Sequence, residues 1–488
     1  MRVARTLLAL SAVVAIVAAL PSGAESRVTA DRALGEVRDA EAVALRDSCR
    51  APSRALSFDK PKYIDSARAG GEPSIQMHPD GTMLYGAHAG TTHFYTFGAA
   101  DENTSAFAEN YTGQVYYYFS KDHGKTWNFV PRTLPPEGLP GSGFSDPDFA
   151  IDAAGNVFVS EINLLNIAVS KSEDSGKSYA LKNFFAFTIT DRQWSAADQK
   201  DVLYMVGNTF GGGTFPSDPA GNIDHILIKS KDGGETFSQA VEDLGGLGDI
   251  HVDQRNGTLY ETHLDEGKLE MWAFRGARKD KFKPDQSPIA KGVSMQSHWP
   301  AFDIDSRGNL YVAWDENGGG KRPAGVYYSY STTAGRTWAR PLRVDRNDNT
   351  DLWPWLAVGG PGRVGVSWLE ASKKLPDNNA ETEGDHGWRI QVAQSRNALG
   401  CRSSAVPGFR TSLATKEPVH TGTICNSGTV CQAQGIDRRM GDYFTIDVDD
   451  KGRLVSGYSD TRQGGAVALP AFFRQSGGPS FGRNTSSP

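Results

Sequence analysis

Apolar and polar positions along the chain repeat one pattern seven times. Each unit has an apolar strand, a turn that ends near a glycine, and a second strand rich in Val, Leu and aromatic residues. The copies start at Glu72 (EPSIQMHPDGTMLYGAH), Asp146 (DPDFAIDAAGNVFVSEI), Trp194 (WSAADQKDVLYMVGN), Gly248 (GDIHVDQRNGTLYETH), Trp299 (WPAFDIDSRGNLYVAWDE), Trp353 (WPWLAVGGPGRVGVSWLE) and Gly441 (GDYFTIDVDDKGRLVSGYSD). β-Hairpins at such intervals are typical of a β-propeller. We therefore predict an all-β propeller of four-stranded antiparallel blades. Seven blades are expected, and six would result if the poorly marked fourth unit merged with a neighbour.

The seventh unit has only three strands of its own. A strand between Ala55 and Tyr63 would complete this blade and close the ring, which would remove the exposed sheet edges. The propeller is therefore expected to span residues 55–475. It would lie between an N-terminal extension (25–54) and a C-terminal tail (476–488) that we expect to be disordered.

Several units are followed by a second signal, Ser-x-Asp-x-Gly-x-Thr-aromatic. It reads SKDHGKTW from Ser120, SEDSGKSY from Ser172, SKDGGETF from Ser230 and, without its Asp, STTAGRTW from Ser331. The Asp or Ser side chain can bond backbone N–H groups across the turn, and the glycine can take the left-handed conformation. These turns resemble the Asp-boxes, or BNR repeats, of the sialidase superfamily, and the resemblance covers about residues 56–475. It implies that the turns are structural and lie on the face away from the active site.

The first 24 residues have the parts of an export signal. Arg2 and Arg5 precede an apolar run from Leu7 to Leu20, and small residues follow at Ser22-Gly23-Ala24. The apolar run is shorter than the roughly 20 residues that span a bilayer. We therefore predict a signal peptide over residues 1–24 and a secreted protein that is not held in a membrane after cleavage.

The charge balance excludes one class of partner. The chain has 51 basic and 57 acidic residues, and the signal contains two of the basic ones, so the remainder has a net charge near −8. Such a charge argues against nucleic acid or an anionic membrane surface as a partner.

Four cysteines in an exported chain are expected to form disulfides, because their spacing matches no zinc pattern. We favour Cys49 with Cys401, which would tie the N-terminal segment to a late blade, and Cys425 with Cys431, which would close a small loop. Four cysteines allow three pairings, and the sequence leaves the other two open.

The starts of the inner strands and the ends of the second strands meet at one face of a propeller, its mouth. Carboxylates, histidines and aromatic rings gather there. Such residues suit a sugar site, because rings stack on pyranoses and carboxylates act as acid, base or nucleophile. The candidate catalytic residues are Tyr443, Asp442, Glu72 and Asp146. The candidate substrate-binding residues are Arg192, Trp194, Asp249, His263, Trp299, Trp353, Glu370 and Arg462. For each of them, packing against the next blade is the competing interpretation.

The resemblance implies a specific comparison. Sialidases that cleave their substrate hold its carboxylate with three arginines, whose planar forks bond both oxygens. They also use a Tyr/Glu pair and an Asp acid/base. Here Glu72-Pro73 stands where such enzymes have Arg-Ile-Pro, and Tyr443 is the nearest positional analogue of the nucleophilic Tyr. The arginines that could still reach the mouth are Arg192, Arg389, Arg438, Arg439 and Arg462.

Two insertions are expected at the same face, over residues 89–113 and 375–388. Loops of this length are uncommon unless they bind something or are disordered. The first is rich in aromatic residues, which favours binding, whereas the second is acidic and could equally be mobile.

These observations leave three functional hypotheses. The first is a secreted sialidase-like glycoside hydrolase that acts on terminal sugars of glycans. The second is a non-catalytic propeller that binds a glycan or a protein, and the third is a polysaccharide lyase, in which a His/Tyr pair abstracts a proton. Serine-hydrolase, P-loop, dinucleotide and HExxH motifs are absent from the sequence. We expect a monomer that takes a glycan or glycoconjugate, with no cofactor and no metal.

Overall fold

A computed structural model describes residues 49–88, 115–131, 145–163, 166–188, 190–210, 223–241, 248–426, 431, 436–463, 465 and 467–482. All of them belong to one unit, Cys49–Pro488. The predicted signal peptide, most of the N-terminal extension and the insertion at 89–113 lie outside these residues.

The described strands form seven antiparallel sheets. Blade I contains β3 (Gly71–Met77), β4 (Met83–His88), β5 (Tyr116–Ser120) and β6 (Asn128–Val130). Blade II contains β7 (Ser145–Ile151), β8 (Val157–Asn163), β9 (Asn166–Ser172) and β10 (Ala180–Thr188). Blade III contains β11 (Thr190–Ala197), β12 (Leu203–Phe210), β13 (Ile223–Ser230) and β14 (Ser238–Val241). Blade IV contains β15 (Ile250–Asp253), β16 (Thr258–Asp265), β17 (Lys268–Phe274) and β18 (Asp285–Lys291).

The last three blades follow the same order. Blade V contains β19 (Ala301–Ile304), β20 (Leu310–Glu316), β21 (Gly325–Ser331) and β22 (Leu342–Arg343). Blade VI contains β23 (Asp351–Val358), β24 (Val364–Ala371), β25 (Gly387–Ser395), β26 (Arg410–Leu413) and β27 (His420–Thr421). Blade VII contains β28 (Thr445–Val448), β29 (Leu454–Asp460) and β30 (Leu469–Gly477).

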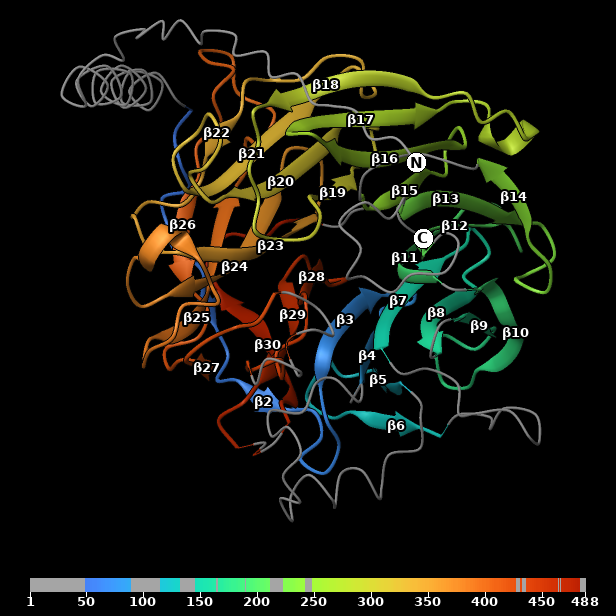
Figure 1. Ribbon diagram of the computed structural model, residues 1–488, viewed down its shortest axis with the longest axis horizontal. Helices are drawn as coiled ribbons and strands as arrows, with labels where there is room; N and C mark the ends of the chain where they lie inside the picture. Colours follow the sequence, from blue (N-terminus) through green and yellow to red (C-terminus); the bar gives the residue numbers. More distant parts are fainter. Residues whose placement is uncertain are drawn as a thin grey trace, which may run out of the picture. The chain divides into compact units, whose positions relative to one another are not determined.

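Each innermost strand contacts the innermost strand of the next blade, and β28 returns to β3, so the ring is closed. Figure 1 shows this ring, with β3, β7, β11 and β28 near its centre. The prediction of a seven-bladed all-β propeller is therefore confirmed. The helical structure among the described residues consists of two short 3-10 turns, η2 (Ala277–Lys279) and η3 (Pro376–Asn378), and the single helical residue Cys431. Within those ranges, no helix has the length and apolar character needed to cross a membrane.

The N-terminal segment completes blade VII. Strands β1 (Ser57–Phe58) and β2 (Lys62–Tyr63) both pair with β30, as the sequence predicted. The Cys49–Cys401 disulfide joins this segment to blade VI. At the other end of the chain, Phe481 is buried in the core of blades VI and VII. The packed fold thus continues beyond residue 475, where the sequence placed the start of the tail.

The Asp-box-like turns join neighbouring blades on the outside of the ring. In each turn the glycine has a positive φ, and at Gly124, Gly176 and Gly234 a Cβ would collide with the preceding blade. At Gly124 the obstacle is the Phe472 ring of blade VII, and at Gly176 it is the Leu84 side chain of blade I. The aromatic residue of a turn also contacts the preceding blade, since the ring centroids of Trp127 and Phe472 lie 5.2 Å apart.

A second set of contacts joins the blades around the channel. An aspartate on one inner strand accepts a backbone N–H from the inner strand of the next blade. The pairs are Ser195 N to Asp148 Oδ2 at 2.7 Å, Phe302 N to Asp249 Oδ2 at 3.4 Å, Val358 N to Asp303 Oδ2 at 2.8 Å and Met77 N to Asp447 Oδ2 at 2.7 Å. These hydrogen bonds replace the backbone ladder that adjacent blades lack.

The channel contains a cavity of about 360 Å³. Burial raises the pKa of Asp148 to about 8, of Asp447 to about 7 and of Asp303 to about 6. His251, which lies 3.4 Å from Asp249, has a pKa raised to about 9, because the nearby carboxylates outweigh its own burial. The channel lining therefore holds protons at neutral pH that the unfolded chain would release.

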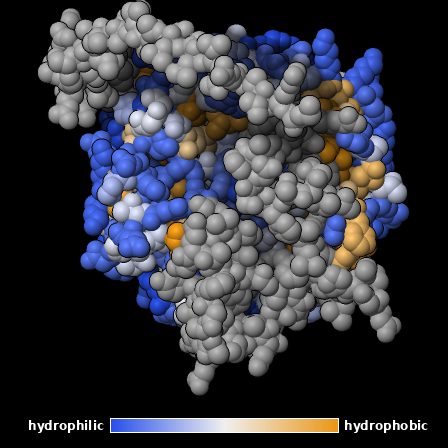
Figure 2. Space-filling view, in the orientation of Figure 1, coloured by the Kyte–Doolittle hydropathy of each residue, from blue (hydrophilic) through white to orange (hydrophobic). Residues whose placement is uncertain are grey.

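Most of the described residues that are visible in Figure 2 are hydrophilic, with smaller hydrophobic areas among them. Among the described residues, the exposed large hydrophobic side chains are Phe185 and Leu413.

We expect Asp122→Ala to lower the melting temperature without a selective effect on the mouth. Asp122 accepts the Thr126 N–H at 2.9 Å and the Thr126 hydroxyl at 2.7 Å, and each lost hydrogen bond costs about 0.5–1.5 kcal/mol. Asp174→Ala should also lower the melting temperature, whereas Asp59→Ala, at an exposed position, should leave it unchanged. Calorimetry measures the effect. An unchanged melting temperature in both turn variants would contradict a structural role.

We expect stability to fall as the pH rises from about 5.5 to 8.5. The folded-state pKa values of Asp148 and Asp447 lie above the ordinary aspartate value, so their stabilising contribution is present at low pH and is lost as the pH rises through about 7 and 8. Asp447→Asn keeps a hydrogen-bond acceptor but cannot titrate. Melting temperatures of this variant should therefore depend less on pH than those of the wild type and of Asp59→Asn. Parallel profiles would refute the titration.

Candidate functional site

Four inner strands begin with a residue in the left-handed conformation. These residues are Glu72 (φ 46°), Asp146 (φ 52°), Arg192 (φ 56°) and Trp353 (φ 53°), and the pairing of each strand with the next shifts register at that point. Bulges of this kind redirect a side chain. A non-glycine residue held at positive φ costs about 1–3 kcal/mol, and such residues concentrate at functional sites. The mouth is therefore the candidate functional site.

Glu72 and Asp146 are close together there. Glu72 Oε2 lies 2.7 Å from His88 Nε2, and one ligand atom from each of Glu72, His88 and Asp146 lies within 4.8 Å of the others. Burial raises the pKa of Asp146 well above the ordinary aspartate value, and the neighbouring Glu72 raises it further. The protonated form of Asp146 is consequently favoured relative to that of an ordinary aspartate.

Asp442 has the opposite electrostatic environment. The Arg438 guanidinium bonds its carboxylate directly, His298 Nε2 lies 3.2 Å away, and Arg192 Nη2 lies 3.8 Å away. Burial alone would raise the pKa of Asp442, but Arg438 and His298 outweigh it and hold that pKa well below the usual range. Asp442 therefore favours its ionised form, whereas Asp146 favours its protonated form.

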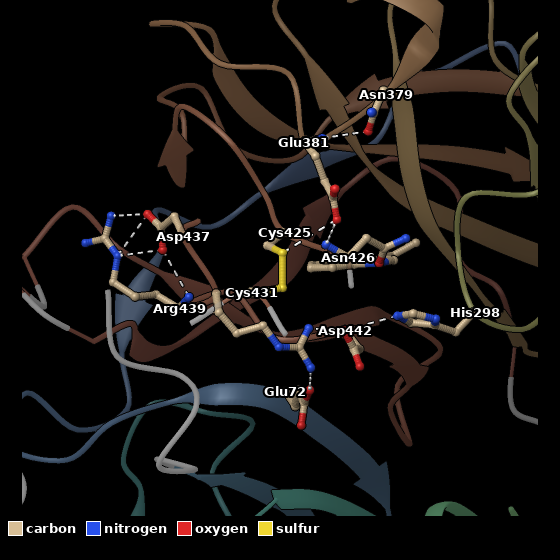
Figure 3. The surroundings of a disulfide bond; sticks show 12 residues. Glu72, His298, Asn379, Glu381, Cys425, Asn426, Cys431, Asp437, Arg439 and Asp442 are labelled. Carbon is tan, nitrogen blue, oxygen red and sulfur yellow. Dashed lines mark hydrogen bonds and ion pairs between the residues drawn. A yellow bond between two sulfur atoms is a disulfide. The ribbon is translucent and has the colours of Figure 1, made fainter. Parts of the chain in front are cut away.

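Arg438 links the two sides of this group, which we call the mouth cluster (Glu72, Asp146, His298, Arg438 and Asp442). Its Nη2 lies 3.4 Å from Glu72 Oε1, across 366 positions of sequence. Figure 3 shows Glu72, Asp442 and His298 gathered beside the Cys425–Cys431 disulfide. Both disulfides of the structure, this one and Cys49–Cys401, are the pairings that the sequence favoured.

Glu72, His88 and Asp146 have donor atoms of the types that hold a divalent cation. However, the buried guanidinium of Arg438 contacts Glu72 and already supplies positive charge there. This arrangement favours proton exchange between carboxyl groups over metal binding. A second group of possible ligands, His123, Asp449 and Asp450, lies near the inner-hairpin turns, where Arg474 Nε donates to Asp449 at 2.6 Å.

Tyr443 lies below the mouth in an aromatic cluster. Its ring contacts Trp194, Trp299 and Trp355 at centroid distances of 5.4, 5.9 and 6.1 Å. Its hydroxyl donates to the Pro147 carbonyl at 3.1 Å, and burial raises its pKa well above that of an ordinary tyrosine. The ring system closes the mouth end of the channel, since Trp194 and Trp355 also line the cavity.

The other predicted binding residues are dispersed. Asp249 lines the channel cavity, and the His263 ring stacks on Trp272 at 4.2 Å. Glu370 accepts Asn347 Nδ2 at 2.8 Å, and Arg462 pairs with Asp460. The structure thus brings together Glu72, Asp146, Asp442 and Arg192, with Trp194, Trp299 and Tyr443 beneath them and Trp353 at the rim.

Sequence reasoning did not single out Asp191, Glu381 or Asn426. Burial raises the pKa of Asp191, although the adjacent Arg192 opposes this. Glu381 and Asn426 bond each other beside the disulfide. The available signals were weak: Asp191 precedes a predicted inner strand, and Asn426 directly follows a cysteine.

No protein-family model matches the chain, and no curated protein matches it. Several solved structures share the propeller fold at low identity. A protein of unknown function from Dyadobacter fermentans is 12% identical, with 86% of this chain and 98% of that one covered and a TM-score of 0.44.

Two enzymes of known structure are similar to this chain to about the same degree. The GH93 α-L-arabinofuranosidase of Fusarium graminearum is 13% identical over 88% of this chain and 98% of its own, with a TM-score of 0.42. The endosialidase of phage phi92 is 9% identical over 86% of this chain and 69% of its own, with a TM-score of 0.45. At this level of similarity these structures carry no argument about the chemistry, which must be argued from the mouth cluster.

Proposed function

We propose that this protein is a secreted glycoside hydrolase that cleaves terminal sugars at the propeller mouth. The observation that carries the proposal is a pair of carboxyl groups at one opening with opposite electrostatic surroundings. Burial and Glu72 favour the protonated form of Asp146, whereas Arg438 and His298 favour the ionised form of Asp442. Environments that push two pKa values apart are how acid and base roles are divided in glycosidases.

Each residue of the site has a distinct task in this scheme. Asp146 donates its proton to the oxygen of the leaving group, and Glu72 keeps that proton available by raising the pKa of Asp146. Asp442 supplies the negative charge that stabilises the oxocarbenium-like sugar in the transition state, and water then adds to the sugar and returns a proton to the Asp146 carboxylate. Tyr443 positions the acid, because its hydroxyl bonds the carbonyl of Pro147, the residue after Asp146.

The alternative is a non-catalytic propeller that binds a glycan at the same mouth. The observation in its favour is the full engagement of Asp442 by Arg438, His298 and Arg192, which suits a fixed hydrogen-bonding surface. A screen of the purified protein against sialosides, other aryl glycosides and acidic polysaccharides separates the two functions. Retention of a glycan without turnover would select the binder.

We expect Asp146→Asn to reduce turnover by about a hundredfold or more, in line with the loss of a general acid. The wild-type rate should fall on the alkaline side as Asp146 loses its proton, and this limb should be missing from the residual activity of the variant. The measurement is a pH–rate profile on whichever glycoside the screen identifies, with Asp59→Asn as the control. Wild-type turnover in Asp146→Asn would rule out the assigned acid.

We expect Tyr443→Phe to lower kcat with little change in KM, because it removes the hydrogen bond that fixes the Asp146–Pro147 bulge but leaves the ring in place. Steady-state kinetics measure this split. The matched control is Tyr330→Phe in blade V, which removes the hydrogen bond from the Tyr330 hydroxyl to the Ala405 carbonyl. Equal effects of the two variants would mean that Tyr443 acts only on stability.

A further inference from the structure

The chain segment that leads into Arg438 is held by the Cys425–Cys431 disulfide. Both cysteines are buried. The backbone N–H of Cys425 donates to the Asp437 carbonyl at 2.9 Å, and the N–H of Ile436 donates to the Cys431 carbonyl at 2.9 Å. Arg438 is therefore attached to a covalently closed loop on its N-terminal side.

This loop is fixed to three other parts of the propeller through Asn426. The N–H of Asn426 donates to Glu381 Oε1 at 2.9 Å, within the insertion of blade VI. Trp353 Nε1 donates to Asn426 Oδ1 at 3.1 Å, and Asn426 Nδ2 donates to the Gln296 carbonyl. Trp353 is itself one of the left-handed residues of the mouth. Figure 3 shows Asn426 between the disulfide and Glu381.

The insertion is part of the same support. It was expected either to bind something or to be mobile, but Leu375 and Ala380 within it are buried. The N–H of Ile424 donates to the Ala380 carbonyl at 3.0 Å. The acidic Glu381 thus bonds the loop at the point where the disulfide begins.

Arg438 needs this support because its guanidinium is buried between two carboxylates. Breaking the geometry of a buried ion pair leaves an uncompensated charge and is strongly unfavourable. Arg438 follows Asp437, whose carbonyl accepts the N–H of Cys425, whereas Asp442 precedes Tyr443, whose hydroxyl is bonded to Pro147. A displacement of the loop therefore moves Arg438 relative to both Asp442 and Glu72.

We propose that the Cys425–Cys431 disulfide, Glu381 and Asn426 form the positioning element of the mouth, which holds Arg438 against Asp442 and Glu72. None of the three contacts the reacting atoms; they act through Arg438. The effect on turnover rests on the proposed function, whereas the placement of Arg438 can be measured without any substrate.

The reporter is His298, whose Nε2 faces Asp442. Its pKa is lowered by burial and by the charges of Arg192 and Arg438, and Asp442 opposes this. If Arg438 moves away, the pKa of His298 should rise. The experiment is an NMR titration of the His298 imidazole in the full secreted chain, with the resonance assigned by His298→Gln.

The paired variants are Cys425→Ser/Cys431→Ser and, as the matched control, Cys49→Ser/Cys401→Ser. The first should raise the pKa of His298 and the second should not, although both remove one disulfide. If the protein proves to be a hydrolase, the first should also lower kcat/KM by about a hundredfold, the size expected for misplaced groups at a catalytic centre. An unchanged His298 titration in the first variant, or an equal shift in the control, would overturn the proposal.

A second comparison keeps the disulfide and so decides the matter even if the first variant does not fold. Glu381→Ala removes the acceptor for the Asn426 N–H, whereas Glu381→Gln retains an oxygen at that position. Glu381→Ala should raise the pKa of His298, and Glu381→Gln should restore the wild-type titration. Identical titrations of Glu381→Ala and the wild type would contradict the positioning role. A wild type without turnover would overturn only the proposed function, since the His298 titration needs no substrate.

Discussion

Closure of the ring is the constraint on which the rest of this structure depends. Seven sheets can surround a channel only if the last one meets the first. Here β28 of blade VII contacts β3 of blade I, and the N-terminal strands β1 and β2 complete blade VII on β30. Two sets of side chains then hold adjacent blades together: the Asp-box-like turns on the outside and the aspartates around the channel. Because a hydrogen bond to a buried backbone N–H is costly to remove, these contacts fix the angle between blades as well as their order.

The mouth cluster is a product of this closure. Glu72, Asp146 and Asp442 come from blades I, II and the segment before blade VII, and only a closed ring brings them to one opening. Burial of several charges at one point is unfavourable unless they are paired. The cluster meets this requirement in two ways: the raised pKa of Asp146 favours its neutral form, and the guanidinium of Arg438 lies between Asp442 and Glu72. The same two solutions produce the unequal carboxyl groups on which the proposed hydrolase depends.

The fold could be predicted from the sequence because its signals are local. Each hairpin and each Asp-box-like turn is encoded within about twenty residues and is repeated, and strand polarity alone grouped Glu72, Asp146 and Asp442. Asp249 was grouped with them but lines the channel. A register shift of one residue exchanges the two faces of a strand. Strand β15 pairs with β16 without the shift that is found at Asp146, so Asp249 is not redirected toward the mouth as Asp146 is. The Arg438–Glu72 contact and the bond between Glu381 and Asn426 depend on tertiary packing across long separations, which no local pattern encodes.

Completion of the last blade by the first strands also determines the order of events during synthesis. Residues 57–63 leave the ribosome before any of the blades, yet their partner β30 ends at Gly477, so they remain without a sheet until that strand has been made. Blades I to VI can form their own hairpins in sequence, but the join must wait for the final strand. Contacts that close such a long loop form slowly because the entropy loss precedes the gain from packing. The propeller is therefore assembled blade by blade. It becomes a cooperative unit only when β1 and β2 pair with β30.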